Sequence, residues 1–464
     1  MKLNHRKLVR KNKVAERVKN DKKLFDICSK NPKAIFSTIK ASKTNSQSKI
    51  QRLHVGDKTY LESEVPDGFY DSLSTLKSLD CTLPENSPTS PSFSTDYENI
   101  IHICSQGPSL PKISLQKAFK ILKNIKPHVT DLYSITALHY LNAGPGGLIH
   151  FYRLLNALIQ NLNNISIDNL NAAYAIVLYK GHKKDKYSDR SYRTISTCPF
   201  LAKCLDVYVR DLNLEAWNHD QADTQFQGEG LSHECASLLL TECIQHSLHS
   251  TNQPVFALYL DAKSAFDVVL RHLLVKNLYF CGTSDASIIF INNRLKSRTT
   301  YLDWDKTIMG PIVDERGLEQ GGVSSSDFYK VFAKEQIQSA QVSEMGVDMR
   351  HTVVSAIGQA DDTVLLSNNI HDLQNLLHLT LNFCSKYHVE LCAEKTKLQA
   401  YCTKKTSLIT QYQKDISPIK ISNTLIPFVD SAEHVGIIRS TTSNLPAILR
   451  RIVSPWEPSS CCQT

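Results

Sequence analysis

Two short segments constrain the fold of this chain more than any other feature of its sequence: residues 255–269 (VFALYLDAKSAFDVV) and residues 353–367 (VVSAIGQADDTVLLS). In the first, six residues typical of a β-strand end at Asp261, and the composition then changes to that of a helix. In the second, two apolar runs flank Asp361 and Asp362, which predicts a β-hairpin with both carboxylates at its tip. The two carboxylates of such a pair repel each other, and the pair persists most easily where a cation neutralises their charge.

Each segment alone has an ordinary explanation, because an aspartate often caps a helix and often occupies a turn. Together they supply one carboxylate from a strand end and two from a hairpin tip, which can lie side by side in one sheet. We therefore expect Asp261, Asp361 and Asp362 to form an oxygen-only metal site suited to two Mg²⁺ ions, with Mn²⁺ as an alternative.

Composition excludes several other classes of protein. The chain has 464 residues, of which 42% are hydrophobic and 21% charged, with no apolar run long enough to span a membrane. Its N-terminus carries charges without an apolar block after them, so we expect no secretory signal and an intracellular protein of the nucleus or cytoplasm. None of the thirteen cysteines forms a C-x-x-C pair, which favours reduced thiols over a zinc site.

Positive charge is concentrated at one end of the chain. Residues 1–43 contain fourteen Lys or Arg against three acidic residues, a net charge of +11, whereas the whole chain carries +8. Such a segment attracts phosphate backbones without reading sequence. A solvated helix or a nuclear-targeting run would have the same composition, so both alternatives stay open.

The Pro- and Ser-rich residues 84–95 are expected to separate an N-terminal region from the main fold. Before them, the patterns predict a helix and then a hairpin around Gly56. After them, the patterns predict three helices, a strand that leads into a basic loop, and a fourth helix. In chain order, these elements are expected at residues 15–40, 50–64, 114–125, 132–143, 147–162, 172–179 and 201–217.

The two acidic segments resemble motifs A and C of non-LTR (LINE-type) retrotransposon reverse transcriptases. Residues 261–267 carry the full D-x-x-x-A-F-D pattern of motif A, and residues 360–362 carry the Ala-Asp-Asp of motif C. Gln359 replaces the aromatic residue that usually precedes them. The resemblance implies that Phe266 closes under the sugar and excludes a 2′-hydroxyl, although a core aromatic would have the same pattern.

Other matches follow in the order of that family. Residues 317–328 (GLEQGGVSSSDF) resemble motif B, so Gln320 and Gly321 would lie against the incoming nucleotide. Residues 192–196 (YRTIS) resemble the R-P-I-S segment, which implies that Arg193 contacts the triphosphate, with Lys180 as a second candidate. Residues 391–397 (LCAEKTK) resemble motif D, in which Lys395 could protonate the leaving pyrophosphate.

The resemblance implies an α+β right-hand polymerase with an antiparallel palm sheet, a fingers lobe and an incomplete thumb. We expect a basic helical N-terminal region and linker at residues 1–110, fingers and the start of the palm at 111–255, the palm with motifs A to D at 256–430, and a truncated thumb stub with an atypical tail at 431–464. No endonuclease is expected before the polymerase and no zinc knuckle after it.

The implied reaction is the magnesium-dependent addition of a dNTP to a DNA primer on an RNA template, with no membrane partner and an open oligomeric state. One alternative is a catalytically inactive retroelement remnant that only binds nucleic acid. Another is an RNA-copying viral polymerase, against which Ala360 argues, because that group usually has Gly before its Asp pair.

Overall fold

The computed structural model describes residues 50–79, 91–161, 168–402 and 419–441, apart from residues 128, 130, 182, 183, 229, 230, 297 and 306. The basic segment 1–43, the first part of the Pro- and Ser-rich stretch and the C-terminal tail lie outside the described residues.

A four-stranded antiparallel sheet carries the two acidic segments. Its strand order is β10-β11-β5-β12, with β10 (Ala356–Gln359), β11 (Asp362–Ser367), β5 (Val255–Leu260) and β12 (Lys397–Tyr401). Every residue of the inner strand β5 is buried. Phe256 and Leu258 pack into the core formed with the helices on one face, whereas Ala257 and Tyr259 pack on the opposite face. A continuous apolar run is what a strand covered on both faces requires.

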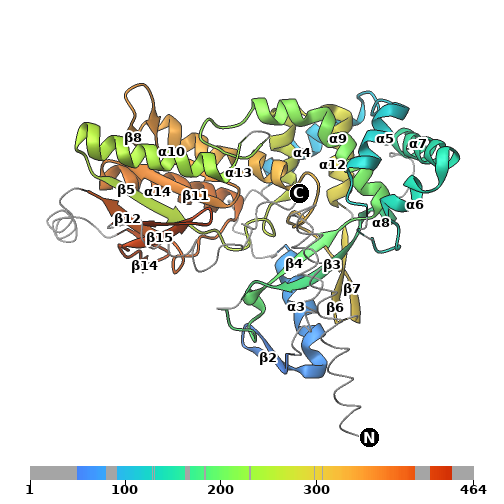
Figure 1. Ribbon diagram of the computed structural model, residues 1–464, viewed down its shortest axis with the longest axis horizontal. Coiled ribbons are helices and arrows are strands. Elements are labelled where there is room, and N and C mark those ends of the chain that lie inside the picture. The colour runs from blue at the N-terminus through green and yellow to red at the C-terminus, as the bar shows by residue number, and fades with distance from the viewer. Residues whose placement is uncertain are drawn as a thin grey trace, which may run out of the picture.

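Helices cover both faces of this sheet (Figure 1). On one side lie α11 (Arg271–Phe280), α13 (Ser325–Val342) and α14 (Ile370–Tyr387), whose buried residues share a core with Phe256 and Leu258. On the other side lies α10 (His233–His246), which shares a smaller core with Ala257 and Tyr259. The sheet is therefore held between two helical layers.

A second four-stranded sheet extends below the first in Figure 1, in the order β4-β3-β6-β7. Its strands are β4 (Tyr192–Thr197), β3 (Ala172–Tyr179), β6 (Thr299–Trp304) and β7 (Thr307–Val313). The contact of β3 with β6 is parallel, and the other two contacts are antiparallel. One face packs against α3 (Val65–Lys77) and the hairpin of β1 (Arg52–Val55) and β2 (Lys58–Leu61).

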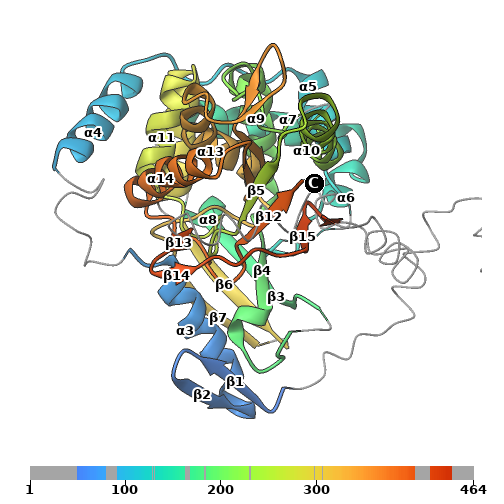
Figure 2. The same cartoon turned by 90° about the vertical axis from the view of Figure 1, so that its left-hand side faces the viewer.

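The remaining elements lie around these two sheets, with α5, α6 and α7 forming one end of the molecule (Figures 1 and 2). The other helices are α4 (Pro91–Ser105), α5 (Leu115–Asn124), α6 (Ala137–Leu141), α7 (Gly144–Asn161), α8 (Asp168–Asn171), α9 (Phe200–His219) and α12 (Asp285–Lys296), with short turns of helix at η1 (Glu62–Glu64), η2 (Asp189–Ser191) and η3 (Ser247–Thr251). Three small hairpins join β8 (Val347–Asp348) to β9 (Val353–Val354), β13 (Lys420–Ile421) to β14 (Thr424–Leu425), and β15 (Ser431–His434) to β16 (Ile437–Ser440).

Most of the elements predicted from the sequence after residue 49 are confirmed. The hairpin around Gly56 forms as β1 and β2, the strand at residues 172–179 forms as β3, and the hairpin at residues 353–367 forms as β10 and β11. The fourth predicted helix forms as α9.

Two predicted helices are wrong in extent. Residues 132–143 are helical only from Ala137 to Leu141, because the Asp131 carboxylate accepts hydrogen bonds from the backbone N–H groups of Tyr133 and Ile135 and stabilises a turn. The helix expected directly after Asp261 begins only at Arg271, and the residues between them form turns. No helix in the described part of the chain is both long and apolar enough to cross a membrane.

Candidate active site

Three carboxylates lie at the same end of the central sheet. Asp261 follows β5 directly, and Asp362 begins β11, which runs antiparallel to β5 with Thr363 opposite Leu260. Asp361 lies with Ala360 in the two-residue turn between β10 and β11. Ala360 has a φ of 55°, a left-handed conformation that non-glycine residues adopt at some cost, and it holds this turn tight.

Charge repulsion is built into this end of the sheet. Asp361 and Asp362 both reach solvent, but the surrounding protein withholds part of their hydration, and the neighbouring carboxylates repel them. These effects raise the pKa of Asp362 to about 7. The pKa of Asp361 is raised for the same reasons, despite the opposing charges of Arg193 and Lys395.

The donor set fits divalent magnesium, which prefers oxygen ligands and especially carboxylates. As the side chains stand, no three His, Cys, Asp or Glu residues in the described part of the chain are gathered closely enough to hold a metal ion. Asp261 instead forms an ion pair with Lys395, whose Nζ lies 3.0 Å from Oδ1 of Asp261. A metal at this site would therefore compete with an ammonium group for Asp261.

Lys395 comes from the segment that precedes β12. The backbone N–H of Cys392 donates to the carbonyl of Asp261 at 2.7 Å, which ties this segment to the end of β5. Partial burial lowers the pKa of Lys395, but the hydrogen bond and charge of Asp261 outweigh that effect and raise the pKa overall. Lys395 is thus fully protonated while it contacts Asp261.

Two further cations approach from the second sheet. Lys180 follows β3, and its Nζ donates to the carbonyl of Arg190 at 2.9 Å. Arg193 is exposed on β4, and its charge acts on both Asp361 and Lys180. Burial lowers the pKa of Lys180, and repulsion from Lys184, Arg193 and Lys395 lowers it further. The structure therefore brings these cations to the same place as the carboxylates.

The loop at residues 317–322 contacts β4 and the segment that follows β5. The Ser196 N–H donates to the carbonyl of Gln320 at 2.9 Å, which pins the loop to β4. A Cβ atom on Gly321 would lie 2.9 Å from the Ser196 carbonyl oxygen, and the φ of Gly321 is +108°, so only glycine fits without strain. The Gln320 side chain donates to Oδ2 of Asp267 at 3.0 Å.

Phe266 lies next to this loop. The Leu318 N–H donates to the carbonyl of Phe266 at 2.7 Å, and the half-buried Phe266 ring stacks on Tyr329, with ring centroids 4.7 Å apart. Tyr329 is buried on α13, where loss of hydration and the charges of Asp361 and Asp362 raise its pKa strongly. The stack therefore places Phe266 against a residue on which the charges of Asp361 and Asp362 act.

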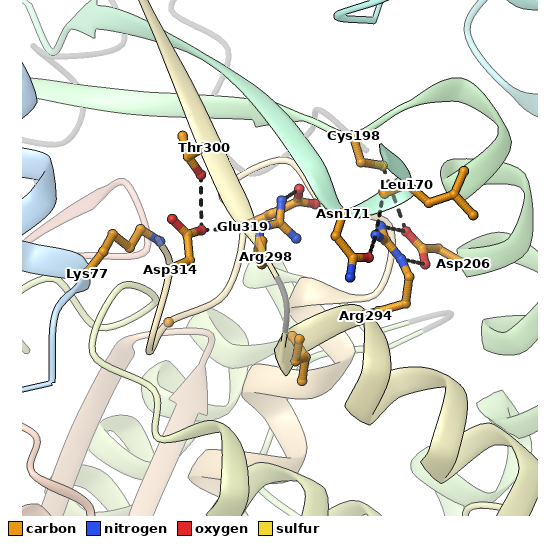
Figure 3. Close-up of polar contacts among 12 residues, drawn as sticks. Lys77, Leu170, Asn171, Cys198, Asp206, Arg294, Arg298, Thr300, Asp314 and Glu319 are labelled. Atoms are coloured by element: carbon orange, nitrogen blue, oxygen red, sulfur yellow. Dashed lines mark hydrogen bonds and ion pairs between the residues drawn. The ribbon is translucent and has the colours of Figure 1, made fainter. Parts of the chain in front are cut away.

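A buried network of charges supports the loop from behind (Figure 3). Arg298 pairs with Glu319 and with Asp314, whose Oδ2 lies 3.2 Å from Nε of Arg298. Thr300 donates to Asp314 at 3.0 Å, and Arg271 donates to the carbonyl of Gly317 at 3.0 Å. Because unpaired buried charges are costly, this network holds residues 314–319 in one arrangement.

An acidic residue of the motif B segment has a partner on another helix. Asp327 accepts a hydrogen bond from Nε of Arg210 at 2.7 Å. Arg210 lies on α9. The acidic residue therefore joins the first turn of α13 to α9, and negative charge at that helix end is favourable.

All nine residues singled out from the sequence lie in this region, but the sequence did not single out several of their partners. Asp267 was part of the recognised pattern without a role. Lys77, Tyr329 and Glu433 carry no local signal, because their importance comes from contacts or charges across long stretches of sequence.

Comparison with known proteins shows the family to which the chain belongs. A family model described as "Reverse transcriptase (RNA-dependent DNA polymerase)" matches residues 181–417, just over half of the chain. The retrovirus-related Pol polyprotein from the type-2 retrotransposable element R2DM of Drosophila melanogaster is 26% identical over 152 residues, which are 33% of this chain and 14% of that protein. The chain thus spans about one seventh of the length of this relative. Residues 181–417, which the family model matches, contain both acidic motifs. The chain belongs to the reverse transcriptase family.

Proposed function

We propose that the chain is the RNA-directed DNA polymerase of a non-LTR retrotransposon, which adds dNTPs to the 3′ end of a DNA primer on an RNA template. The observation that carries this proposal is that Asp261 and the Asp361–Asp362 turn lie at the same end of one sheet, with Lys395 paired to Asp261 and the charge of Arg193 acting on Asp361. The similarity to a Pol polyprotein of a retrotransposable element supports the same source.

Asp261, Asp361 and Asp362 would hold two Mg²⁺ ions, which supply Lewis-acid activation of the attacking hydroxyl and charge neutralisation at the leaving pyrophosphate. The raised pKa of Asp362 supports this assignment, because loss of hydration and repulsion from Asp361 and Asp261 both disfavour its charged form until a cation arrives. Lys395 would leave Asp261 at that point and become available as a proton donor to the pyrophosphate.

Lys180 and Arg193 would contact the triphosphate. The guanidinium of Arg193 suits bidentate phosphate contacts. The pKa of Lys180 is lowered by burial and by repulsion from neighbouring cations, and an arriving polyphosphate would relieve that repulsion. Gln320 and Gly321 would lie against the base and sugar, since the loop backbone is held at β4. Phe266, fixed by its stack on Tyr329, would exclude a 2′-hydroxyl.

In architecture, the β10-β11-β5-β12 sheet would be the palm, and the β4-β3-β6-β7 sheet with its helices would belong to the fingers, so that β6 and β7 would be moved from the palm expected at residues 256–430 to the fingers. The hairpin of β15 and β16 beside β12 would lead towards a thumb. In this arrangement the RNA template and DNA primer would pass between the two sheets, over the end where the carboxylates lie.

Primer extension on an RNA template with Mg²⁺ and dNTPs tests the proposal. Asp361→Asn combined with Asp362→Asn should lower the rate at least a thousandfold, because the amides cannot neutralise the ions. Asp211→Asn, which removes only a surface ion pair with Lys117, serves as a control and should keep the rate. Extension that survives the double substitution would overturn the proposal. Binding of primer and template without extension by the unmodified chain would instead support a role in nucleic-acid binding alone.

A further inference from the structure

Asp267 is a buried carboxylate that is not one of the three proposed metal ligands, and its two oxygens contact different parts of the chain. Asp267 is 5% exposed and ends the motif A segment. Its Oδ2 accepts a hydrogen bond from the Gln320 side chain at 3.0 Å, and its Oδ1 lies 3.4 Å from Nζ of Lys77. Both side chains of the Lys77–Asp267 pair are almost fully enclosed, so the pair is poorly screened by solvent.

Lys77 is the last residue of α3 and lies outside the segment that the family model matches. Its carbonyl also accepts hydrogen bonds from the backbone N–H groups of Glu315 at 3.1 Å and Arg316 at 3.3 Å. These residues lead directly into the loop at residues 317–322. The backbone of Lys77 therefore contacts the residues that precede this loop. Its side chain contacts Asp267, which accepts the hydrogen bond from Gln320.

Asp267 lies within electrostatic range of a second cation, Lys180. A buried carboxylate that loses its cation is strongly destabilised and takes up a proton or another cation. Without Lys77, the available cation is Lys180, whose head group would move towards Asp267 and away from the triphosphate.

We propose that Lys77 is a positioning residue for nucleotide binding, which satisfies Asp267 so that Gln320 stays oriented and Lys180 stays free for the triphosphate. This inference rests on the proposed polymerase function. It makes α3 part of the nucleotide site, although α3 carries none of the recognised motifs.

Steady-state primer extension separates this role from simple packing. Lys77→Met keeps the length of the side chain and removes its charge. It should raise the KM for dNTP about tenfold, the size of one charge-assisted contact, and leave kcat within about twofold. Lys77→Met combined with Asp267→Asn should bring KM back to within about threefold, since the neutral amide cannot attract Lys180 but its oxygen still accepts from Gln320. Lys334→Met, which breaks a more exposed Lys–Asp pair with Asp220, is the control for loss of a lysine charge and should leave KM unchanged.

An unchanged KM in Lys77→Met would overturn the proposal. A defect that Asp267→Asn does not relieve would overturn it too, because that result means that α3 only packs against the fold. If Lys77→Met folded poorly and the double variant folded well, a KM for dNTP that stayed about tenfold raised in the double variant would overturn the proposal.

Hydrogen exchange gives a readout that does not depend on catalysis. Amides at residues 315–322 should exchange several times faster in Lys77→Met than in the unmodified chain, and more slowly again in the double variant. An absence of primer extension by the unmodified chain would count against the polymerase function, whereas unaltered exchange in Lys77→Met would count against the positioning role.

Discussion

At the scale of single residues, the loss of hydration at Asp362 and its repulsion by Asp361 and Asp261 predict how stability depends on pH. The pKa of Asp362 in the folded protein is raised to about 7, above its value of about 4 in the unfolded chain. The folded state therefore binds more protons between these values, and the contribution of Asp362 to stability falls as pH rises from about 4 to about 7. Metal-free Asp362→Asn should lose this decline.

Thermal unfolding of both proteins between pH 5 and pH 8, with EDTA or with Mg²⁺, measures the effect. The midpoint of Asp362→Asn should exceed that of the unmodified protein by more at pH 8 than at pH 5 in EDTA. Added Mg²⁺ should raise the midpoint of the unmodified protein only. If the difference between the two midpoints in EDTA did not depend on pH, the charged form of Asp362 would not be disfavoured in the folded protein as described.

The stack of Phe266 on Tyr329 predicts sugar selectivity. Phe266→Ala would remove the ring that Tyr329 fixes and open space beside the loop at Leu318. The ratio of rNTP to dNTP incorporation should rise at least tenfold, because a steric clash with the 2′-hydroxyl is removed. Single-nucleotide extension with each substrate measures it, and Tyr329→Phe, which keeps the stack, is the control. A ratio that does not change would assign Phe266 to the core alone.

Residues within the motifs could be predicted from sequence, because a strand end or a hairpin tip locates a carboxylate without knowledge of the rest of the fold. Asp261 and Asp362 are examples. Lys77 and Tyr329 could not be predicted in this way. Each acts through a partner that is distant in sequence, so only the packing of α3 and α13 reveals them.

At the scale of elements, apolar runs predicted β3, β5 and the β10–β11 hairpin well, since β5 is buried throughout, the hairpin is mostly buried, and β3 is buried on one face. The segment between Asp261 and α11 was expected to be helical and is not. Its chain turns at Ser264, which has a φ of 49°, so that the carbonyl groups of Phe266 and Val269 can accept from Leu318 and Gly317. Tertiary hydrogen bonds thus override a local preference for helix.

The charge network behind the loop predicts an order of stabilities. Asp314→Asn should lower the free energy of unfolding by about 4 kcal/mol, because Arg271 and Arg298 both lose a buried anion. Glu319→Gln should cost about 2 kcal/mol, since Arg298 keeps Asp314. Urea unfolding measures both values, with the surface variant Asp211→Asn expected to change stability by less than about 0.5 kcal/mol. Equal losses in the two buried variants would contradict this order.

At the scale of the whole molecule, the mixed helix-and-sheet fold was predicted correctly, because strands and helices both have clear periodicity in the sequence. The division into four domains stays a prediction. The arrangement of β3 beside β6 in parallel could not be read from the sequence, since these strands are separated by over a hundred residues and are joined through several helices. That arrangement brings Lys180 and Arg193 to the carboxylates.

Two deletions predict separate roles for the beginning of the chain. Removal of residues 1–49 takes away the segment of net charge +11 but leaves β1, β2 and α3. This variant should unfold cooperatively and extend primers at low salt. The slope of log K against log salt for nucleic-acid binding should fall by roughly 0.7 to 0.9 for each phosphate that the removed segment neutralised. An unchanged slope would mean that the basic segment does not contact nucleic acid.

Removal of residues 1–79 should have a different result. It would expose the face of the second sheet that Phe69 and Leu73 cover, and it would remove Lys77 from Asp267. We expect aggregation or a strongly lowered midpoint of unfolding, and no primer extension, although every residue from 181 to 417 is retained. Size-exclusion chromatography and primer extension on both variants measure these outcomes. If the shorter chain were monomeric and active, α3 would be dispensable, and the catalytic unit would be no larger than the segment that the family model matches.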